Sequence, residues 1–178
     1  MSTNGSNGSD SNGSIFELSE AQIQDSRVMV VDDDALVTSS LSSFLSLEVE
    51  IEPIIFNESP KAAQYLADNE VDLIISDFLM PDMDGIQLLT EARRLQPEIP
   101  RVLLTGYADK ENAIKAINEV RVFQYIEKPW DNERLREVVE NAVERIFLLR
   151  LLLRKLDELS ETQQELSEYR RSLIRVFA

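Results

Sequence analysis

The chain has 178 residues, of which 43% are hydrophobic and 29% are charged, a composition typical of one globular domain with appendages. Its formal net charge of −15 disfavours direct binding to nucleic acid or to an anionic membrane, and suits a protein partner or a site that gathers metal cations. Because the chain contains neither histidine nor cysteine, histidine-based catalytic triads, histidine-ligated zinc, phosphohistidine carriers, disulfides and thiolate chemistry are excluded.

The N-terminal segment differs in composition from the rest of the chain. Residues 1–14 are almost entirely Ser, Asn, Gly, Thr and Asp, which offer too little apolar surface to fold, so we predict a disordered polar tail over residues 1–24. This tail lacks the cationic start and the apolar stretch of a signal peptide, and no apolar run in the chain approaches the roughly 20 residues of a membrane span. With no cysteine present, we expect a cytoplasmic protein that does not contact membranes.

Five short β-type runs alternate with helical patterns over residues 25–147. Several are near-continuous runs of Val, Ile and Leu, typical of strands buried on both faces of a parallel sheet. This alternation predicts right-handed βαβ units and a doubly wound α/β fold, with a five-stranded parallel sheet of the flavodoxin-like order 2-1-3-4-5. The predicted strands are residues 27–32, a run within 49–56, and residues 72–77, 100–105 and 121–126.

Start signals mark several of the predicted helices. Ser59 is predicted to N-cap a helix with Pro60 at its first position, and Asp109 and Asp131 are predicted to cap two later helices. Neither Gly nor Pro occurs from residue 132 to the end, which predicts that the last helix continues beyond the sheet.

The last helix carries a heptad seam with two polar interruptions, at spacings that alternate between three and four. The seam residues are Leu149, Leu152, Leu156, Leu159, Gln163, Leu166, Arg170 and Leu173. Because an isolated helix would expose this stripe, we predict a coiled-coil signalling helix over residues 148–178 and a homodimer through residues 148–174. The alternative is that the helix folds back onto the sheet.

Polar residues gather where the predicted strands end. Asp32 and Asp33 end the first strand, Asp77 ends the third, Thr105 ends the fourth, and Lys128 follows the fifth by two residues. Ligands bind at the carboxyl ends of the strands in open parallel sheets, and the first and third strands are neighbours, so the three carboxylates are expected to converge. Oxygen ligands without His or Cys favour Mg²⁺. One carboxylate could then act as a nucleophile that forms an acyl phosphate, with the lysine and threonine stabilising the transferred group.

Two glycines lie in the part of the chain predicted to fold. Gly106, beside Thr105, is predicted to leave room for a phosphoryl group. Gly85 is predicted to allow an unusual backbone conformation in the loop after Asp77.

The segments VMVVDDD, IISDFLMPDMDG, VLLTG and YIEKPW resemble the receiver domain of bacterial response regulators, with motif order and spacing kept over residues 25–147. The resemblance implies a phosphorylation switch rather than a metabolic enzyme, limited to self-phosphotransfer and autodephosphorylation. It implies that the phosphoryl donor is a phosphohistidine on a partner histidine kinase or phosphotransfer protein. Asp77 would be the phosphoacceptor, and Mg²⁺ would be bound directly by Asp33, through water by Asp32, and by the backbone carbonyl of Leu79.

The same resemblance implies roles for residues of the fourth and fifth strands. Thr105 and Lys128 would contact the phosphoryl group, and Tyr125 matches the switch aromatic of the family. Leu79 and Tyr107 occupy positions where the family tunes dephosphorylation. We hypothesise that these two bulky side chains hinder the attacking water and slow hydrolysis.

Two questions remain open from the sequence. A haloacid-dehalogenase-type phosphatase is the competing class, with Asp32 as nucleophile and Asp34 as acid or base, although that class needs a second acidic motif late in the fold. The output is also unassigned. The signal is expected to pass through the last helix to an output domain of a longer parent chain, which could be an enzyme, or to a protein partner.

Overall fold

The structure is a computed structural model that describes residues 20–106 and 120–177, with side chains described over residues 22–106 and 120–172. Tyr107 and Asp109, for which the sequence predicts a tuning role and a helix cap, lie outside the described residues.

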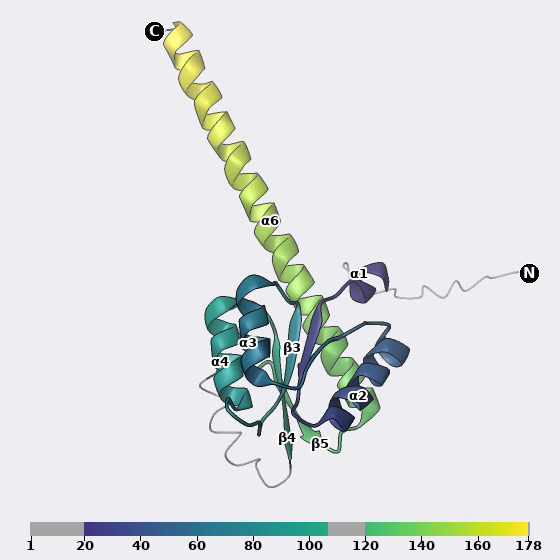
Figure 1. Ribbon diagram of the computed structural model, residues 1–178. Coiled ribbons are helices and arrows are strands. Elements are labelled where there is room, and N and C mark those ends of the chain that lie inside the picture. The colour runs from purple at the N-terminus through teal and green to yellow at the C-terminus, as the bar shows by residue number, and fades with distance from the viewer. Residues whose placement is uncertain (1–19, 107–119, 178) are drawn as a thin grey trace, which may run out of the picture.

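A five-stranded parallel sheet forms the centre of the domain, in the order β2-β1-β3-β4-β5 (Figure 1). The predicted doubly wound α/β fold with the flavodoxin-like strand order is therefore confirmed. The strands are β1 (Val28–Val31), β2 (Ile54–Phe56), β3 (Leu73–Asp77), β4 (Arg101–Gly106) and β5 (Gln124–Lys128).

The bounds of β5 differ from the predicted residues 121–126. Arg121 has a φ of 53°, a left-handed conformation that an extended strand cannot contain. The pairing of β5 with β4 runs from Val102↔Gln124 to Gly106↔Lys128. Lys128 is therefore the last residue of the strand instead of following it by two residues.

Helices cover both faces of the sheet in the described part of the chain. They are α1 (Glu20–Gln24), α2 (Ala35–Phe44), the π-helical turn η1 (Leu45–Val49), α3 (Ser59–Asp68), α4 (Gly85–Leu95) and α6 (Asn132–Phe177). Figure 1 shows α3 and α4 on one side of the sheet and α2 with the first part of α6 on the other. Successive strand side chains point to opposite faces, so Val28 and Val30 join the core under α2 and α6, whereas Met29 and Val31 join the core under α3 and α4.

The last residues of the predicted polar tail are helical. Residues 20–24 form α1, and Ile23 packs against the core under α2 and α6. Gln24 Nε2 also donates to Glu50 Oε2 at 2.5 Å. The apolar Ile23 gives this segment a surface to bury, which residues 1–14 lack.

Helix caps follow the sequence signals with one correction. Asp131 caps α6 as predicted, since its Oδ1 accepts from the backbone N–H of Arg134 at 2.9 Å. Ser59, in contrast, is the first residue of α3, whose N-cap is Glu58. The buried Ser59 hydroxyl instead donates to the carbonyl of Met83 at 2.6 Å, so it joins α3 to the loop that precedes α4.

Helix α6 is one continuous helix of 46 residues. Its first part packs under the sheet through Leu135, Val139, Val143 and Ile146, and the helix then leaves the domain as a single rod (Figure 1). It does not fold back onto the sheet. The seam leucines beyond the domain are exposed, from 52% to 69% for Leu152, Leu156, Leu159 and Leu166. None of the helices in the described residues is long and apolar enough to cross a membrane.

A buried ion-pair cluster lies where α6 leaves the domain. Asp72, directly before β3, is only 2% exposed and accepts from the backbone N–H of Arg27 at 2.7 Å and from its guanidinium at 3.0 and 3.1 Å. Arg150 of α6 also donates to the Asp72 carboxylate. Burial disfavours the charge of Asp72, but the hydrogen bonds from Arg27 and Arg150 outweigh this cost and lower its pKa below the ordinary value.

Candidate acidic site at the carboxyl edge of the sheet

Three carboxylates converge where β1 and β3 end. Asp32 and Asp33 directly follow β1, Asp77 is the last residue of β3, and the two strands pair in parallel up to Val31↔Ser76. One carboxylate oxygen from each aspartate lies within 4.8 Å of those from the other two. Asp32 and Asp77 are buried, whereas Asp33 is exposed, so the cluster opens to solvent on the side of Asp33.

Lys128 joins the site from the end of β5. Its Nζ lies 2.6 Å from Asp32 Oδ2 and 2.5 Å from Asp77 Oδ1. Burial opposes the charge of this ammonium group, but the hydrogen bonds with Asp32 and Asp77 outweigh that effect and raise the pKa of Lys128 above its ordinary value. The site therefore contains one permanent cation shared by two buried carboxylates.

Asp77 is left with more negative charge around it than one lysine can balance. Burial raises its pKa, Lys128 opposes that rise, and the neighbouring Asp32 adds to it, so that the net shift is upward. The other oxygen of Asp77, Oδ2, accepts from the backbone N–H of Leu79 at 3.0 Å. A donor set of carboxylate oxygens without His or Cys, and with an excess of negative charge, fits a hard divalent cation such as Mg²⁺.

Thr105 lies on β4, the strand next to the one that ends at Asp77, and Tyr125 lies on β5, one strand farther away. Thr105 is buried in β4 one residue beyond Leu104, the register partner of Asp77, and its hydroxyl donates to the carbonyl of Gly106 at 3.2 Å. The ring of Tyr125 is half-buried against the core under α3 and α4. The topology therefore brings both residues to the same half of the sheet as Asp77, and in the described part of the chain no hydrogen bond is seen between either side chain and Asp77.

Asn57 belongs to the site although the sequence analysis did not identify it. Its side-chain amide donates to the carbonyl of Asp32 at 2.8 Å and to the Thr38 hydroxyl at 3.0 Å. It therefore ties the loop after β1 to both β2 and α2. The sequence could have indicated Asn57 through its position, because a polar residue directly after the second strand lies at the carboxyl edge of the sheet, where the aspartates also lie.

Gly85 is required for space and not for an unusual backbone conformation. It is the first residue of α4 and has no positive φ; the positive φ in this loop belongs to Asp82, at 66°. A Cβ at Gly85 would lie 2.0 Å from the carbonyl oxygen of Asp77, and the Gly85 N–H donates to Phe78 at 2.9 Å. The glycine therefore allows α4 to begin directly against the backbone that carries Asp77.

The model of the response regulator receiver domain matches residues 28–140, and the chain belongs to this family. Acceptance of a phosphoryl group is the general function of this domain, and receiver domains generally bind Mg²⁺ at an acidic pocket.

Relatives of known name carry the same domain. The hydrogenase transcriptional regulatory protein HoxA of Cupriavidus necator is 35% identical over 117 residues, which are 66% of this chain and 24% of that protein. The regulatory protein AtoC of Escherichia coli K12 is 34% identical over 118 residues, 66% of this chain and 25% of that protein. The chain thus matches about a quarter of the length of these relatives. Among solved structures, the signal receiver domain of an HD domain-containing protein from Pseudomonas fluorescens Pf-5 has a TM-score of 0.63 at 34% identity, and covers 68% of this chain and 97% of its own.

The phosphatase alternative finds no support in the site. The side chain of Asp34, its required acid or base, accepts from the backbone N–H of Leu36 at 2.8 Å and so caps α2. The family assignment and this occupied carboxylate both favour the receiver interpretation, in which Asp34 is structural.

Proposed function

We propose that Asp77 is the residue that accepts the phosphoryl group, and that Mg²⁺ assists the transfer. The observation that carries this proposal is the convergence of Asp32, Asp33 and Asp77 around one shared lysine. Asp32 also contacts Lys128 and accepts from a backbone N–H, that of Asp34, but it is only 1% exposed. Asp77 is 8% exposed and is the last residue of β3, the middle strand of the sheet, so it is the better placed of the two to meet a phosphoryl donor.

The transfer is a displacement at phosphorus. An oxygen of Asp77 forms the new bond to phosphorus while the bond from phosphorus to the imidazole nitrogen of the donor breaks, and the imidazole leaves. The donor is a phosphohistidine on a histidine kinase or phosphotransfer protein. Asp33 and the carbonyl of Leu79 would bind Mg²⁺ directly and Asp32 through water; the bound cation would neutralise charge that develops on the phosphoryl oxygens.

Lys128 and Thr105 act on the product of this transfer. Once Asp77 has become an acyl phosphate, the Lys128 ammonium is released from one carboxylate partner and can bind a phosphoryl oxygen with a charge-assisted hydrogen bond. The Thr105 hydroxyl must exchange its bond to Gly106 for one to the phosphoryl group. Tyr125 then moves with Thr105, a shift between two packed arrangements of β4 and β5.

We also propose that helix α6 transmits the switch, so that residues 25–147 are the receiver and residues 148–178 the signalling helix. The exposed leucines of the seam need a partner surface, and a second copy of the same helix supplies one with matching heptad spacing. In this proposal the homodimer forms through residues 148–174, and the signal passes to an output domain or to a protein partner, without direct binding to nucleic acid. Any enzyme activity would belong to that output and not to the receiver.

Phosphorylation is tested with acetyl phosphate and Mg²⁺, followed by intact mass spectrometry. The wild-type chain should gain the mass of one phosphoryl group, and Asp77→Asn should gain none. The matched control is Asp82→Asn, which makes the same change at a nearby loop residue. An acyl phosphate mapped to Asp32 in the wild type would contradict the proposal and favour the phosphatase alternative.

The dimer is tested by sedimentation equilibrium with and without beryllofluoride, a mimic of the phosphoryl group. The wild type should sediment as a dimer in at least one of these states, and the double variant Leu156→Asp, Leu159→Asp should be monomeric. Leu36→Asp is the control, because Leu36 is 81% exposed on α2 and outside α6. A wild-type monomer in both states would refute the proposed dimer.

A further inference from the structure

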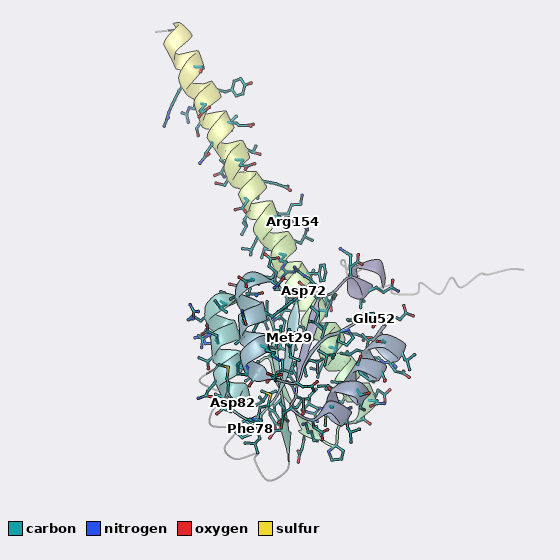
Figure 2. All side chains as sticks on the ribbon, in the orientation of Figure 1. Met29, Glu52, Asp72, Phe78, Asp82 and Arg154 are labelled. Atoms are coloured by element: carbon teal, nitrogen blue, oxygen red, sulfur yellow. The ribbon has the colours of Figure 1, made fainter. Side chains whose placement is uncertain are left out.

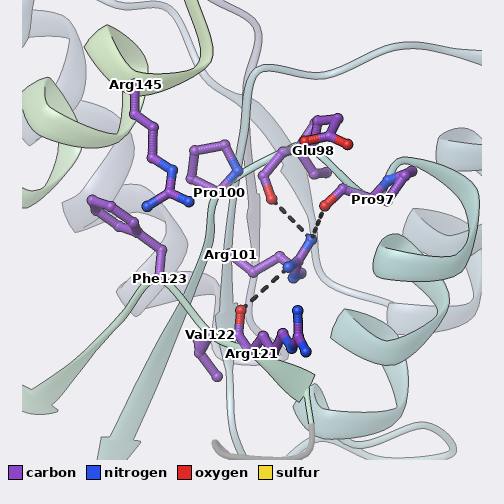
Figure 3. A pocket seen from close by; sticks show the side chains of 9 residues that line it. Pro97, Glu98, Pro100, Arg101, Arg121, Val122, Phe123 and Arg145 are labelled. Carbon is purple, nitrogen blue, oxygen red and sulfur yellow. Dashed lines mark hydrogen bonds between the residues drawn. The ribbon is translucent and has the colours of Figure 1, made fainter. Parts of the chain in front are cut away.

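A second charged site lies at the opposite, amino edge of the sheet, around the buried Arg101 at the start of β4. The residue is 6% exposed, and within the described residues its guanidinium donates only to backbone carbonyls: to Pro97 at 3.2 Å, Ile99 at 2.9 Å and Arg121 at 3.2 Å (Figure 3). Its Nε–H is buried and has no hydrogen-bond partner. Among the described residues no carboxylate forms an ion pair with Arg101, although buried charges are normally paired.

Further arginines face the same space. Arg101 lines a surface pocket of about 330 Å³ together with Arg121, just before β5, and Arg145 of α6. The guanidinium of Arg145 lies 5.6 Å from the ring centroid of Phe123, and Figure 3 shows it beside that ring and Pro100. Among the described residues that line the pocket, Glu98 is the one acidic residue. Three arginines and one glutamate leave a local excess of positive charge, in a chain whose net charge is −15.

The electrostatic environment of Arg101 agrees with this excess. Burial lowers the pKa of its guanidinium, and the charges of Arg93 and Arg145 lower it further, whereas Glu98 acts weakly in the other direction. A buried arginine ordinarily neutralises a carboxylate, and among the described residues Arg101 has no carboxylate to neutralise. An anion in the pocket would supply the missing countercharge.

We propose that the pocket lined by Arg101, Arg121 and Arg145 binds the phosphate group of a small molecule. The local excess of about two positive charges matches a phosphate monoester, which carries roughly −1.5 to −2 at pH 7. Arg121 and Arg145 are exposed and can turn their guanidinium groups onto the anion in the bidentate geometry that suits phosphate. Arg101, which is buried in the wall of the pocket, contributes a positive charge that is fixed in place.

This pocket is separate from the acidic site. It lies before the first residues of β4 and β5, whereas Asp77 and Lys128 are the last residues of β3 and β5. Three carboxylates would also repel a phosphate from the acidic site in the absence of a metal ion. Binding of phosphate without a divalent cation therefore reports on the arginine pocket.

The probe is inorganic phosphate, titrated calorimetrically into the full chain in the presence of EDTA. Arg121→Gln and Arg145→Gln should each weaken binding by about tenfold or more, the usual effect of losing a hydrogen bond between charged groups. Arg94→Gln is the matched control, since Arg94 is an exposed arginine paired with Glu91 on α4 and should bind like the wild type. Both substituted arginines are exposed, so the variants are expected to fold. They also leave unchanged the buried Arg101, whose hydrogen bonds join the loops around the pocket.

Three results would overturn the proposal. The first is no phosphate binding by the wild type at the highest concentration tested, and the second is binding by Arg121→Gln and Arg145→Gln as tight as that of Arg94→Gln. Loss of binding in Lys128→Gln would instead place the phosphate at the acidic site, where Lys128 is the cation that pairs with Asp32 and Asp77.

Discussion

Two aspartates close the two ends of strand β3, and their surroundings are opposite. Asp72 directly precedes the strand and Asp77 is its last residue; they are 2% and 8% exposed. Asp72 is shared by two arginines, Arg27 and Arg150, whereas Asp77 shares one lysine with a second buried carboxylate. Figure 2 shows Asp72 beside the exit of α6, and Phe78, the residue after Asp77, at the opposite end of the domain.

The comparison shows that burial alone does not decide what a carboxylate does. The two side chains are buried to a similar degree, yet the pKa of Asp72 is lowered and that of Asp77 is raised. The opposite pKa shifts follow from the number of cationic side chains that contact each carboxylate. The charge of Asp72 is more than balanced by two arginines, so this residue holds the structure together. The single lysine beside Asp77 also has to balance Asp32, so Asp77 is suited to bind a cation or to be modified.

The largest expected difference between the two ends is in the free energy of unfolding. Asp72→Asn leaves Arg150 without its carboxylate and Arg27 paired only with the exposed Glu70, and should destabilise the protein by roughly 1–3 kcal/mol in urea unfolding. Asp77→Asn removes repulsion from Asp32 and leaves Lys128 paired with Asp32, so stability should change by less than about 1 kcal/mol. Equal losses in the two variants would show that the distinction between a structural and a reactive aspartate is wrong.

The pH dependence of stability should differ in sign between the ends. The lowered pKa of Asp72 contributes stability that is present above its unfolded value and is lost as the pH falls through the folded value. The raised pKa of Asp77 acts oppositely, because stability decreases as the pH rises through its folded value and the buried carboxylate ionises.

Urea unfolding across the acidic range, in the absence of divalent cations, would separate these contributions. The stability difference between wild type and Asp72→Asn should shrink towards low pH. For Asp77→Asn the difference should change in the other direction between the unfolded and folded pKa values. Parallel curves for the two variants would contradict the assigned shifts.

Addition of Mg²⁺ should act on one end of β3 only. Free Mg²⁺ at about tenfold above its dissociation constant should stabilise the wild type by about 1.4 kcal/mol, which thermal unfolding would detect. Asp33→Asn removes an exposed ligand and should lose most of this gain. Asp34→Asn, at the adjacent helix cap, is the control that should keep it.

The smallest expected effect is on the rate at which water hydrolyses the phosphoryl group at the acidic site. Leu79 is 57% exposed and its N–H donates to Asp77, so its side chain stands close to the attacked phosphoryl group. Leu79→Ala should speed loss of the phosphoryl group by about threefold to fivefold, a change in barrier of less than about 1 kcal/mol. Leu36→Ala controls for removal of an exposed leucine. An unchanged half-life in Leu79→Ala would refute the shielding hypothesis for this residue.

The sequence predicted the fold and the acidic end because both depend on repeating local patterns. Apolar runs that alternate with helical segments define the parallel sheet, and the topology of such a sheet brings its strand ends together. Asp32, Asp33 and Asp77 could therefore be placed in one site although 44 residues separate Asp33 from Asp77 in the chain.

The amino end could not be predicted in the same way. Asp72 and Arg150 are 78 residues apart, and each looks in the sequence like an ordinary charged residue beside an apolar run. Arg101 lies within the predicted strand of residues 100–105, and the local pattern does not indicate that it is buried without a carboxylate partner. The role of Gly85 depends on how closely α4 approaches Asp77, and the start of β5 depends on the turn at Arg121. These are tertiary distances and backbone angles that local patterns do not encode.

The ion pair between Asp72 and Arg150 anchors helix α6 at the edge of the domain. We therefore expect any tilt of the helix to pivot at this point. The arm inside the domain, from residue 132 to 149, is about 27 Å long, and the arm from Arg150 to Phe177 is about 40 Å long. The outer arm is therefore about 1.5 times as long as the inner arm, so a displacement of about 1–2 Å at the inner end moves the tip by roughly 1.5–3 Å. Paired helices lie about 8–10 Å apart, and a tilt of that size cannot separate them. We therefore expect an output coupled to this helix to sense which side of the rod faces its partner.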